Sequence, residues 1–370
     1  MTTIPAERVT GAVAVIPCHD LDATLDFFRG ELGFRIDVIS PADDPSTVLM
    51  SGHGARIRLQ RTEASVDPGV LQLLVDGDVP STPVVAPNGT RVEFVAAEPG
   101  IQIPPIAQSL TVSRLADSVG FHTGRAGMTY RDLDPDRQGG RFIASHIRIA
   151  DGGPVKDYVH FHQVRFQMIY VHRGWVKVVY EDQGEPFVMH AGDLVLQPPT
   201  IRHRVLESSD GMEVIEVGCP AEHDTLAEHV ITLPTGRHLP ERTYGNQLFT
   251  RHVAAEAPWL PFRYAGFVQQ DLGIGAATDG LAAARVIRPD AAGADSWPMA
   301  VVDNEFLLTF VLDGTVTLDL GAPASRQEAL VSGDCAVIPA DQAYALRAIS
   351  ADARILEVSL PADLEPRVLS

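Results

Sequence analysis

The chain has 370 residues, of which 45% are hydrophobic and 21% are charged, and 29 lysines and arginines against 48 aspartates and glutamates give a formal net charge of −19. This length predicts two or three domains, and the negative charge argues against nucleic acid and anionic membrane surfaces as partners, because both would repel the chain. The three cysteines lie far apart, no apolar run approaches membrane-spanning length, and the first residues lack the pattern of a signal peptide. We therefore expect a cytoplasmic protein.

The first hundred residues predict a small α+β domain. Residues 9–17 have the composition of a buried strand. An apolar side chain then recurs at helical spacing along one stripe, at Leu21, Leu25, Phe28 and Leu32. Three short strand-like runs follow, at residues 34–39, 47–50 and 55–59. The predicted order is β-α-β-β-β.

This order, with the run of residues 20–34 inside it, resembles the vicinal-oxygen-chelate (glyoxalase/bleomycin-resistance) fold. Residues 86–94 are similar to the last turn and strand of that family. Between Gly69 and Val95 there is room for two strands but for no clear helix. Of the metal positions that the resemblance implies, only Glu93 is kept. We therefore expect residues 1–100 to be a packing, dimerisation or lid module that binds no metal.

Three histidines in the stretch from Gly153 to His203 are candidate metal ligands. Side chains alternate along a strand, so that His160 and His162 project to one face while Phe161 points away. His203 follows a second strand and a proline-containing turn. Neutral imidazole binds zinc, iron, nickel and copper. The pattern therefore predicts a metal site, and the alternative is a set of barrel histidines satisfied by hydrogen bonds.

The spacing around these histidines resembles the two sequence motifs of the cupin superfamily. The first motif is matched by Gly153, His160, His162, Gln167 and Gly174, with glutamine where most members carry glutamate. The second is matched by Gly192, Pro198 and His203, with Thr200 in the place of its last glycine. The resemblance implies a jelly-roll barrel with one divalent ion held by the three histidines. Gln167 is either a fourth ligand or a hydrogen-bonding barrel residue.

Residues 266–360 resemble a second copy of this barrel that has lost its ligands. Residues 306–314 align with 166–174, and residues 333–344 align with 192–203. The alignment places Ala300, Val302, Leu307 and Tyr344 at the positions of His160, His162, Gln167 and His203. Aliphatic side chains cannot coordinate a metal, so only the first barrel is expected to hold one.

The predicted fold is therefore mainly β, with two cupin jelly-roll barrels (a bicupin) preceded by a small α+β (βαβββ) glyoxalase-like domain. We expect the glyoxalase-like domain at residues 1–100, the metal-binding cupin at 101–235 and the degenerate cupin at 236–370. Besides Gln167, two residues are candidates for the catalytic pocket. Tyr158 shares the strand parity of His160, and His146 lies in the pocket if its face of the strand at 141–149 points inward.

Similar cupin dioxygenases use histidine-only sites, so the resemblance implies an Fe(II) dioxygenase or oxygenase acting on a small chelating molecule such as a diketone, a catechol-like compound or a hydroxy acid. One alternative is a Zn-, Mn- or Ni-dependent isomerase, lyase or hydrolase that uses the ion as a Lewis acid. Another is a non-catalytic protein that binds or senses a small molecule through its metal. We expect a homodimer with no nucleic-acid or membrane partner.

Overall fold

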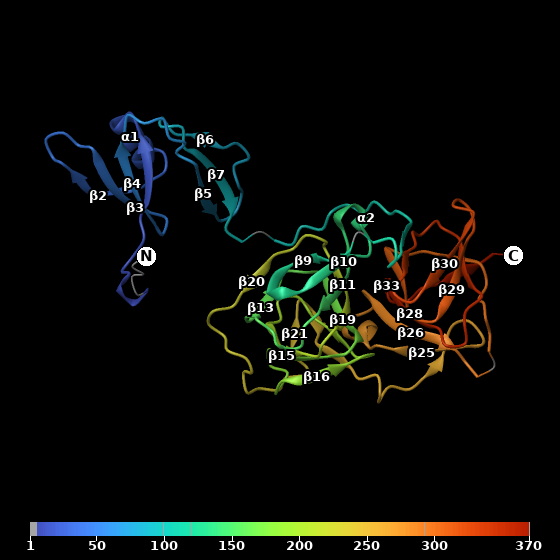
Figure 1. Ribbon diagram of the computed structural model, residues 1–370. Helices are drawn as coiled ribbons and strands as arrows, with labels where there is room; N and C mark the ends of the chain where they lie inside the picture. The colour runs from blue at the N-terminus through green and yellow to red at the C-terminus, as the bar shows by residue number, and fades with distance from the viewer. Residues whose placement is uncertain (1–5, 99, 119, 292, 370) are drawn as a thin grey trace. The chain divides into compact units, whose positions relative to one another are not determined.

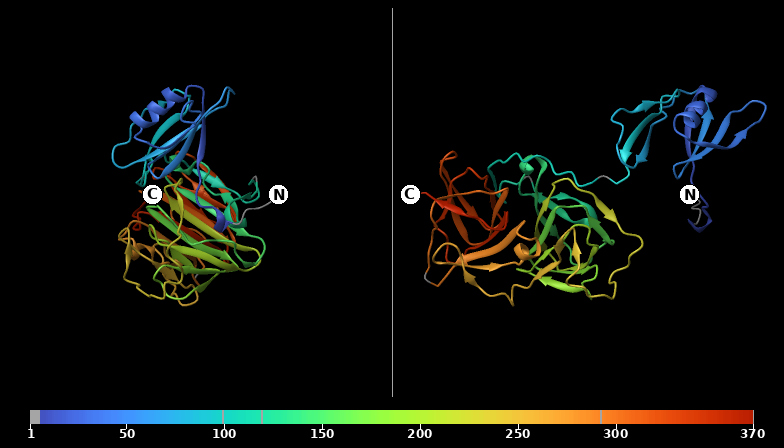
Figure 2. Two further views of the ribbon diagram at one scale, coloured as in Figure 1. Left: turned by 90° about the vertical axis from the view of Figure 1, so that its left-hand side faces the viewer. Right: turned by 180° about the vertical axis from the view of Figure 1, so that it is seen from behind.

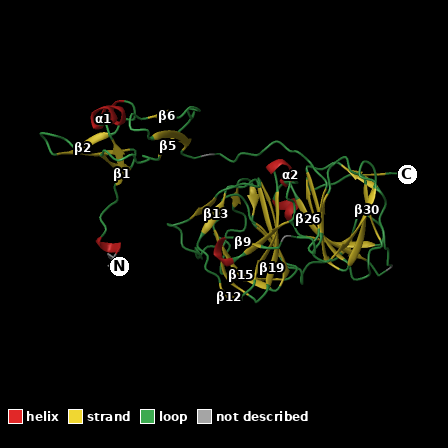
Figure 3. Cartoon of the chain, turned by 45° about the horizontal axis from the view of Figure 1, so that its top comes forward, coloured by secondary structure: helices red, strands yellow, loops and turns green. Residues whose placement is uncertain are grey.

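The computed structural model describes residues 6–98, 100–118, 120–291 and 293–369 (Figure 1). The chain divides into two compact units, Met1–Gly100 and Ile101–Ser370. Strands dominate both units, and the helices are few and short (Figure 3). Among the described residues, none of the helices has the length and apolar character needed to cross a membrane.

The first unit contains the predicted β-α-β-β-β order. After a single 3₁₀ turn (Ala6–Arg8) the elements are β1 (Ala14–Cys18), α1 (Leu21–Gly30), β2 (Arg35–Ser40), β3 (Thr47–Gly52) and β4 (Ala55–Arg61). The four strands form one sheet in the order β1-β4-β3-β2. Asp20 caps α1, because its side chain accepts a hydrogen bond from the backbone N–H of Ala23 at 2.9 Å. The apolar stripe of the helix packs on the sheet through Leu21 and Phe28.

The rest of this unit is a three-stranded sheet in the order β5-β7-β6. Its strands are β5 (Val70–Val75), β6 (Val84–Val85) and β7 (Arg91–Ala96). The sequence predicted two strands here, and the additional strand, β6, is too short to show strand alternation. Glu93 on β7 accepts a hydrogen bond from Gln72 at 3.0 Å and pairs with Arg91 at 3.1 Å. Its carboxylate thus has ordinary surface partners, and the likeness of this unit to glyoxalases stays a prediction.

The second unit begins with a barrel of two facing sheets. One sheet has the order β23-β17-β14-β19-β11-β10-β9 and the other β16-β15-β18-β13-β20. The strands of the first sheet are β9 (His122–Thr123), β10 (Thr129–Asp132), β11 (Ile143–Ile149), β14 (Phe166–Arg173), β17 (Leu194–Leu196), β19 (Met212–Cys219) and β23 (Thr250–His252). Those of the second are β13 (His160–His162), β15 (Trp175–Tyr180), β16 (Phe187–His190), β18 (His203–Ser208) and β20 (Thr225–Ala227), with β12 (Gly153–Pro154) paired to β18.

A second barrel repeats this order strand for strand, with sheets β8-β31-β28-β33-β26-β25-β24 and β30-β29-β32-β27-β34. The strands of its first sheet are β8 (Thr111–Ser113), β24 (Leu260–Pro261), β25 (Phe267–Asp271), β26 (Ala283–Pro289), β28 (Phe306–Asp313), β31 (Cys335–Val337) and β33 (Arg354–Leu360). Those of the second are β27 (Ala300–Val302), β29 (Thr315–Leu320), β30 (Arg326–Val331), β32 (Tyr344–Arg347) and β34 (Pro366–Val368). The connections contain a 3₁₀ turn (Arg125–Gly127), α2 (Arg137–Gly140), α3 (Ile274–Ala277) and the hairpin of β21 (Thr243–Tyr244) and β22 (Gln247–Leu248).

The two barrels lie side by side (Figures 1 and 2) and share one hydrophobic core. At its centre the rings of Phe142 and Phe306 stack with their centroids 4.5 Å apart. The barrels also exchange edge strands, because β8 precedes the first barrel but pairs with β31 of the second, while β23 follows the first barrel in the chain and pairs with its β17. Each predicted cupin range, 101–235 and 236–370, thus contributes a strand to the other barrel, and the boundary between the two ranges stays a prediction.

Candidate metal centre

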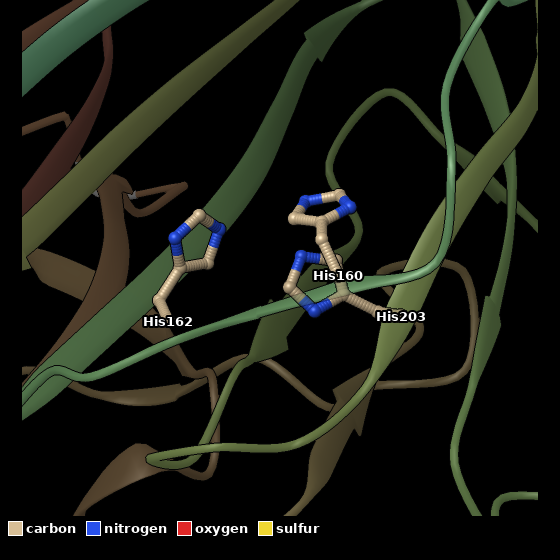
Figure 4. A group of neighbouring side chains, drawn as sticks. All are labelled: His160, His162 and His203. Atoms are coloured by element: carbon tan, nitrogen blue, oxygen red, sulfur yellow. The ribbon is translucent and has the colours of Figure 1, made fainter. Parts of the chain in front are cut away.

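The three histidines predicted as ligands converge inside the first barrel (Figure 4). One ligand atom from each of His160, His162 and His203 lies within 4.8 Å of the other two, and all three residues are buried. Two adjacent strands position them, because His160 on β13 is paired in register with His203 on β18, and His162 follows two residues later on the same face. This spacing suits a single shared ion.

Hydrogen bonds hold the three rings at Nδ1, so that each Nε2 carries the lone pair; that of His160 accepts a hydrogen bond from Arg125 at 2.6 Å. Nδ1 of His160 donates to the carbonyl oxygen of Tyr158 at 2.8 Å, and Nδ1 of His203 donates to that of Ile201 at 3.0 Å. Nδ1 of His162 lies 3.2 Å from the hydroxyl of Thr225. A ring that keeps its proton on Nδ1 offers Nε2 as a ligand, which is the arrangement that holds metal-binding histidines in place.

Burial keeps these imidazoles neutral. Desolvation, together with the neighbouring His160 and His223, lowers the pKa of His162 to about 2. Desolvation also lowers the pKa of His203 well below its ordinary value, and that of His160, where the charge of Arg125 adds to the effect. Only neutral imidazole binds a metal, so the site is in its ligand form at neutral pH.

Thr200 marks the turn that brings His203 to the site. It stands where the second motif has its last glycine, and its φ of 66° lies in the left-handed region that favours glycine. Its backbone N–H donates to the carbonyl oxygen of His162 at 2.9 Å. This turn of the second motif is thus hydrogen-bonded directly to a ligand residue of the first, at the cost of backbone strain in a β-branched residue.

A cavity of about 310 Å³ opens beside the histidines inside the barrel. His162 and His203 line it together with mostly apolar side chains, among them Met128, Ile147 and Val214. Such a cavity suits a small organic ligand with an apolar body, and its few polar groups fix the orientation of the ligand.

Gln167 and Glu216 form a polar pair in this cavity. Nε2 of Gln167 donates to Oε1 of Glu216 at 2.7 Å, and Oε1 of Gln167 is buried without a hydrogen-bond partner. Leaving a buried acceptor unpaired costs about 1–3 kcal/mol. An ion or a ligand donor would satisfy this oxygen, and a role of Gln167 as a fourth ligand beside the three histidines stays a prediction.

Two predicted pocket residues lie elsewhere. His146 points to the other face of β11, where its Nε2 lies 2.7 Å from Glu213 and its ring contacts Phe310 of the second barrel. The opposite parity of that strand, with Ile143 and Ile147, lines the cavity instead. Tyr158 is half exposed and does not belong to the cavity lining; its carbonyl oxygen accepts a hydrogen bond from His160, and its ring lies 5.7 Å from that of His160. The hypothesis that His146 lies in the pocket is therefore wrong, and a catalytic role of Tyr158 stays a prediction.

Three functional groups of the cavity were not predicted: Arg125, Glu216 and His223. His223 donates from Nδ1 to the carbonyl oxygen of Pro220 at 2.9 Å, and its ring lies 5.3 Å from that of His162. None of the three belongs to a motif. The parity of β19 was the only available signal, since it places Glu216 on the same face as Val214, which also lines the cavity.

The second barrel lacks the ligands at the positions that the sequence predicted. Ala300 pairs in register with Tyr344 as His160 pairs with His203. Beside them Glu357, which corresponds in register to Glu216, is buried and held by Arg263 at 2.9 and 2.5 Å and by Arg285 at 2.9 Å. The carboxylate of this barrel is thus neutralised by arginines, whereas that of the first barrel faces a cavity.

Comparisons with known proteins agree with this architecture. A family model described as a cupin domain matches residues 145–218. Similar solved structures include an oxalate decarboxylase from Lactobacillus farciminis in complex with formate, at 16% identity and a TM-score of 0.51 over 72% of this chain and 92% of that chain. Ylba from E. coli has 11% identity and a TM-score of 0.50 over 71% and 96% of the two chains, and vicilin from Capsicum annuum has 11% and 0.51 over 70% and 88%.

No curated protein matches the chain in sequence. At these low identities the likeness to solved structures concerns the fold alone. The matching family model and the strand-for-strand repeat agree with the sequence motifs of the first barrel. Residues 145–218 therefore form a cupin domain, and the two successive barrels of residues 101–370 have the bicupin fold.

Proposed function

We propose that the chain is a metal-dependent bicupin enzyme whose first barrel holds one divalent ion through His160, His162 and His203. The observation that supports this most directly is the set of three buried imidazoles with ligand atoms within 4.8 Å of one another, beside an apolar cavity that His162 and His203 line. We propose Fe(II) as the ion, with Zn, Mn and Ni as alternatives, because neutral imidazole suits iron, zinc and nickel and the amide oxygen of Gln167 suits manganese. When bound, the ion supplies a positive, redox-active centre with open coordination positions.

The proposed reaction is the oxygenation of a small chelating organic molecule. The proposed ligands, three imidazoles and the amide oxygen of Gln167, are all neutral and do not compensate the charge of the ion. This favours an anionic chelating ligand such as an enolate, a catecholate or a hydroxy acid. The apolar wall of the cavity favours a ligand that also carries a hydrocarbon body. Oxalate, the substrate named for the decarboxylase relatives, has no apolar part and suits this wall poorly.

A second candidate is a Lewis-acid isomerase, lyase or hydrolase. Glu216 and His223 line the cavity without belonging to the three-histidine cluster, and such reactions need a group that accepts or donates a proton close to the substrate. A non-catalytic binding or sensing protein is the third. The homodimer and a pairing role for residues 1–100 also remain proposals, and sedimentation of the full chain and of residues 101–370 tests both.

Elemental analysis of protein purified without added metal tests the first step. We expect about one equivalent of iron per chain, and zinc in its place would favour the Lewis-acid reading. Oxygen consumption during a screen of diketones, catechols and hydroxy acids supports an oxygenase, whereas metal-dependent turnover without oxygen uptake supports the alternative. Ligand-induced stabilisation without any turnover favours a binding protein. His160→Ala is the control that should remove the metal and every one of these signals.

A further inference from the structure

Arg125 is the single positively charged side chain, histidines aside, among the described residues that line the cavity. It lies in the connection between β9 and β10, and its side chain is one third exposed, so it stands where the cavity meets solvent. One nitrogen of its guanidinium, Nη1, donates to Oδ1 of the fully buried Asp157 at 2.7 Å. The backbone N–H of Val205 fixes the other oxygen of that carboxylate at 2.9 Å.

The second guanidinium nitrogen reaches a proposed metal ligand. Nη2 of Arg125 lies 2.6 Å from Nε2 of His160. Because Nδ1 of His160 donates to the Tyr158 carbonyl oxygen, Nε2 carries the lone pair and accepts the hydrogen bond from Arg125. An imidazole nitrogen has one lone pair, which cannot serve an N–H donor and a metal ion together. Arg125 and the ion therefore compete for His160.

The second barrel has an arginine at the equivalent position, and there it is fully paired with a glutamate. Arg263 lies in the equivalent connection, between β24 and β25, and both of its terminal nitrogens bind Glu357. In the first barrel the corresponding groups are kept apart, since Arg125 binds Asp157 and Glu216 binds Gln167. The first barrel thus holds an arginine with one nitrogen committed to protein carboxylate and one that a ligand can take.

We propose that Arg125 is the anion-binding residue of the cavity and that it becomes available to a ligand when the metal ion binds His160. This inference rests on the proposed metal site. Loading of His160 by the ion frees Nη2 while Asp157 keeps the guanidinium at the cavity mouth. The freed nitrogen then binds the carboxylate or enolate oxygen of a ligand whose apolar body occupies the cavity. Binding is consequently ordered, with the metal first and the anionic ligand second.

The first test is zinc affinity, measured by competition with a chromophoric chelator. The Arg125→Gln variant lacks both the hydrogen-bond donor that competes for the lone pair of His160 and a positive charge beside the ion. It should therefore bind zinc about tenfold more tightly than the wild type, which corresponds to the free energy of one charge-assisted hydrogen bond. Arg125→Lys keeps a cation for the buried Asp157 in case the glutamine variant folds poorly. It should shift the zinc affinity in the same direction, because a single ammonium cannot contact Asp157 and His160 as the two terminal nitrogens of arginine do.

The second test uses hexanoate and its neutral analogue hexan-1-ol as probes in calorimetric titrations. In the zinc-loaded proteins Arg125→Gln should bind hexanoate about tenfold more weakly than the wild type and hexan-1-ol equally well. In the metal-free proteins the difference for hexanoate should nearly vanish, because Arg125 is then engaged by His160. Arg202→Gln is the matched control, since Arg202 precedes His203 but binds Glu228 and lies over the ring of Phe161.

The outcomes separate the two proposals. Wild-type protein that binds no zinc removes the proposed function and this inference with it. Wild-type protein that binds zinc, with unchanged or weaker zinc binding in both Arg125 variants, overturns the inference alone. Equal hexanoate binding by zinc-loaded wild type and Arg125→Gln overturns it as well. A tenfold effect that Arg202→Gln reproduces would show a general charge effect and would also overturn it.

Discussion

Exchange of the side chains of Gln167 and Glu216 should bring a negative charge to the proposed ion. The double variant Gln167→Glu/Glu216→Gln keeps one amide and one carboxylate at the 2.7 Å contact, so the hydrogen bond can form again in the opposite sense. The net charge of the pair is unchanged. The carboxylate moves to the position at which the first cupin motif usually has glutamate.

The magnitudes show why the exchange is cleaner than Gln167→Glu alone. Two ionised carboxylates about 3 Å apart repel each other by about 5–6 kcal/mol at an effective dielectric constant of about 20. Protonation of an ordinary glutamate at pH 7 costs only about 4 kcal/mol. The single variant would therefore hold a shared proton, and its metal binding would mix coordination with titration. The exchanged pair avoids this, because only one of its members is acidic.

Zinc and anaerobic Fe(II) affinities, measured by chelator competition, provide the assay. Replacement of a neutral oxygen by a charged one roughly doubles the strength of a polar interaction, so we expect the exchanged variant to bind at least tenfold more tightly than the wild type. Glu216→Gln alone removes the negative charge and should bind severalfold more weakly. Equal affinity in the exchanged variant and the wild type, with equal thermal stability, would refute coordination by Gln167 and leave it as a hydrogen-bonding barrel residue.

Three further results are expected. His203→Ala should lower metal affinity at least 100-fold, whereas Tyr344→Phe, at the equivalent position of the second barrel, should leave it unchanged; loss of metal from the Tyr344 variant would contradict the assignment of the two barrels. The pKa of about 2 for His162 means that the stability contributed by its neutral form is present above pH 6.5 and decreases as the pH falls, by about 2 kcal/mol at pH 5; a Tm of the metal-free protein that stays level between pH 7 and 5 would contradict this. Deletion of residues 1–100 should leave the barrels folded and metal-binding, because the core of residues 1–100 is separate from that of the barrels. A chain that starts at Gly120 also loses β8, and it should show a lower Tm or aggregate through the uncovered edge of β31.

Strand alternation and the internal repeat were sufficient to predict most of the fold. The alignment of Tyr344 with His203 came from turn residues and apolar runs, and the pairing of Ala300 with Tyr344 in the same register as His160 with His203 confirms it. The exchanged edge strands could not be predicted. β8 and β23 have three residues each, too few to show a period, and their partners are decided only when both barrels have closed.

The candidate ligands could be predicted because motif spacing fixes neighbours on adjacent strands, whereas the cavity residues could not. Arg125 reaches His160 from 35 positions earlier, outside both sequence motifs. Alternation shows that His146 and Ile147 face opposite sides of β11, but it does not show which side is the barrel interior. The prediction that His146 lines the pocket was wrong because the face of β11 that carries His146 is also buried, against the second barrel.

Asp157 accounts for part of the difference between the two barrel interiors, and Arg285, which stands where the first barrel has Ser145, also binds Glu357. Three residues before the ligand position the first barrel has this buried aspartate, while the repeat places Trp297 at the corresponding site of the second. Without a carboxylate there, Arg263 turns to Glu357 and the pair closes the interior. In the first barrel Asp157 binds Arg125 and holds it away from Glu216. Glu216 accepts a hydrogen bond from Gln167 instead. The second barrel thus lacks both the metal ligands and this aspartate. A barrel without a ligand cavity needs no residue that keeps its arginine and its glutamate apart, so the two can form an ion pair.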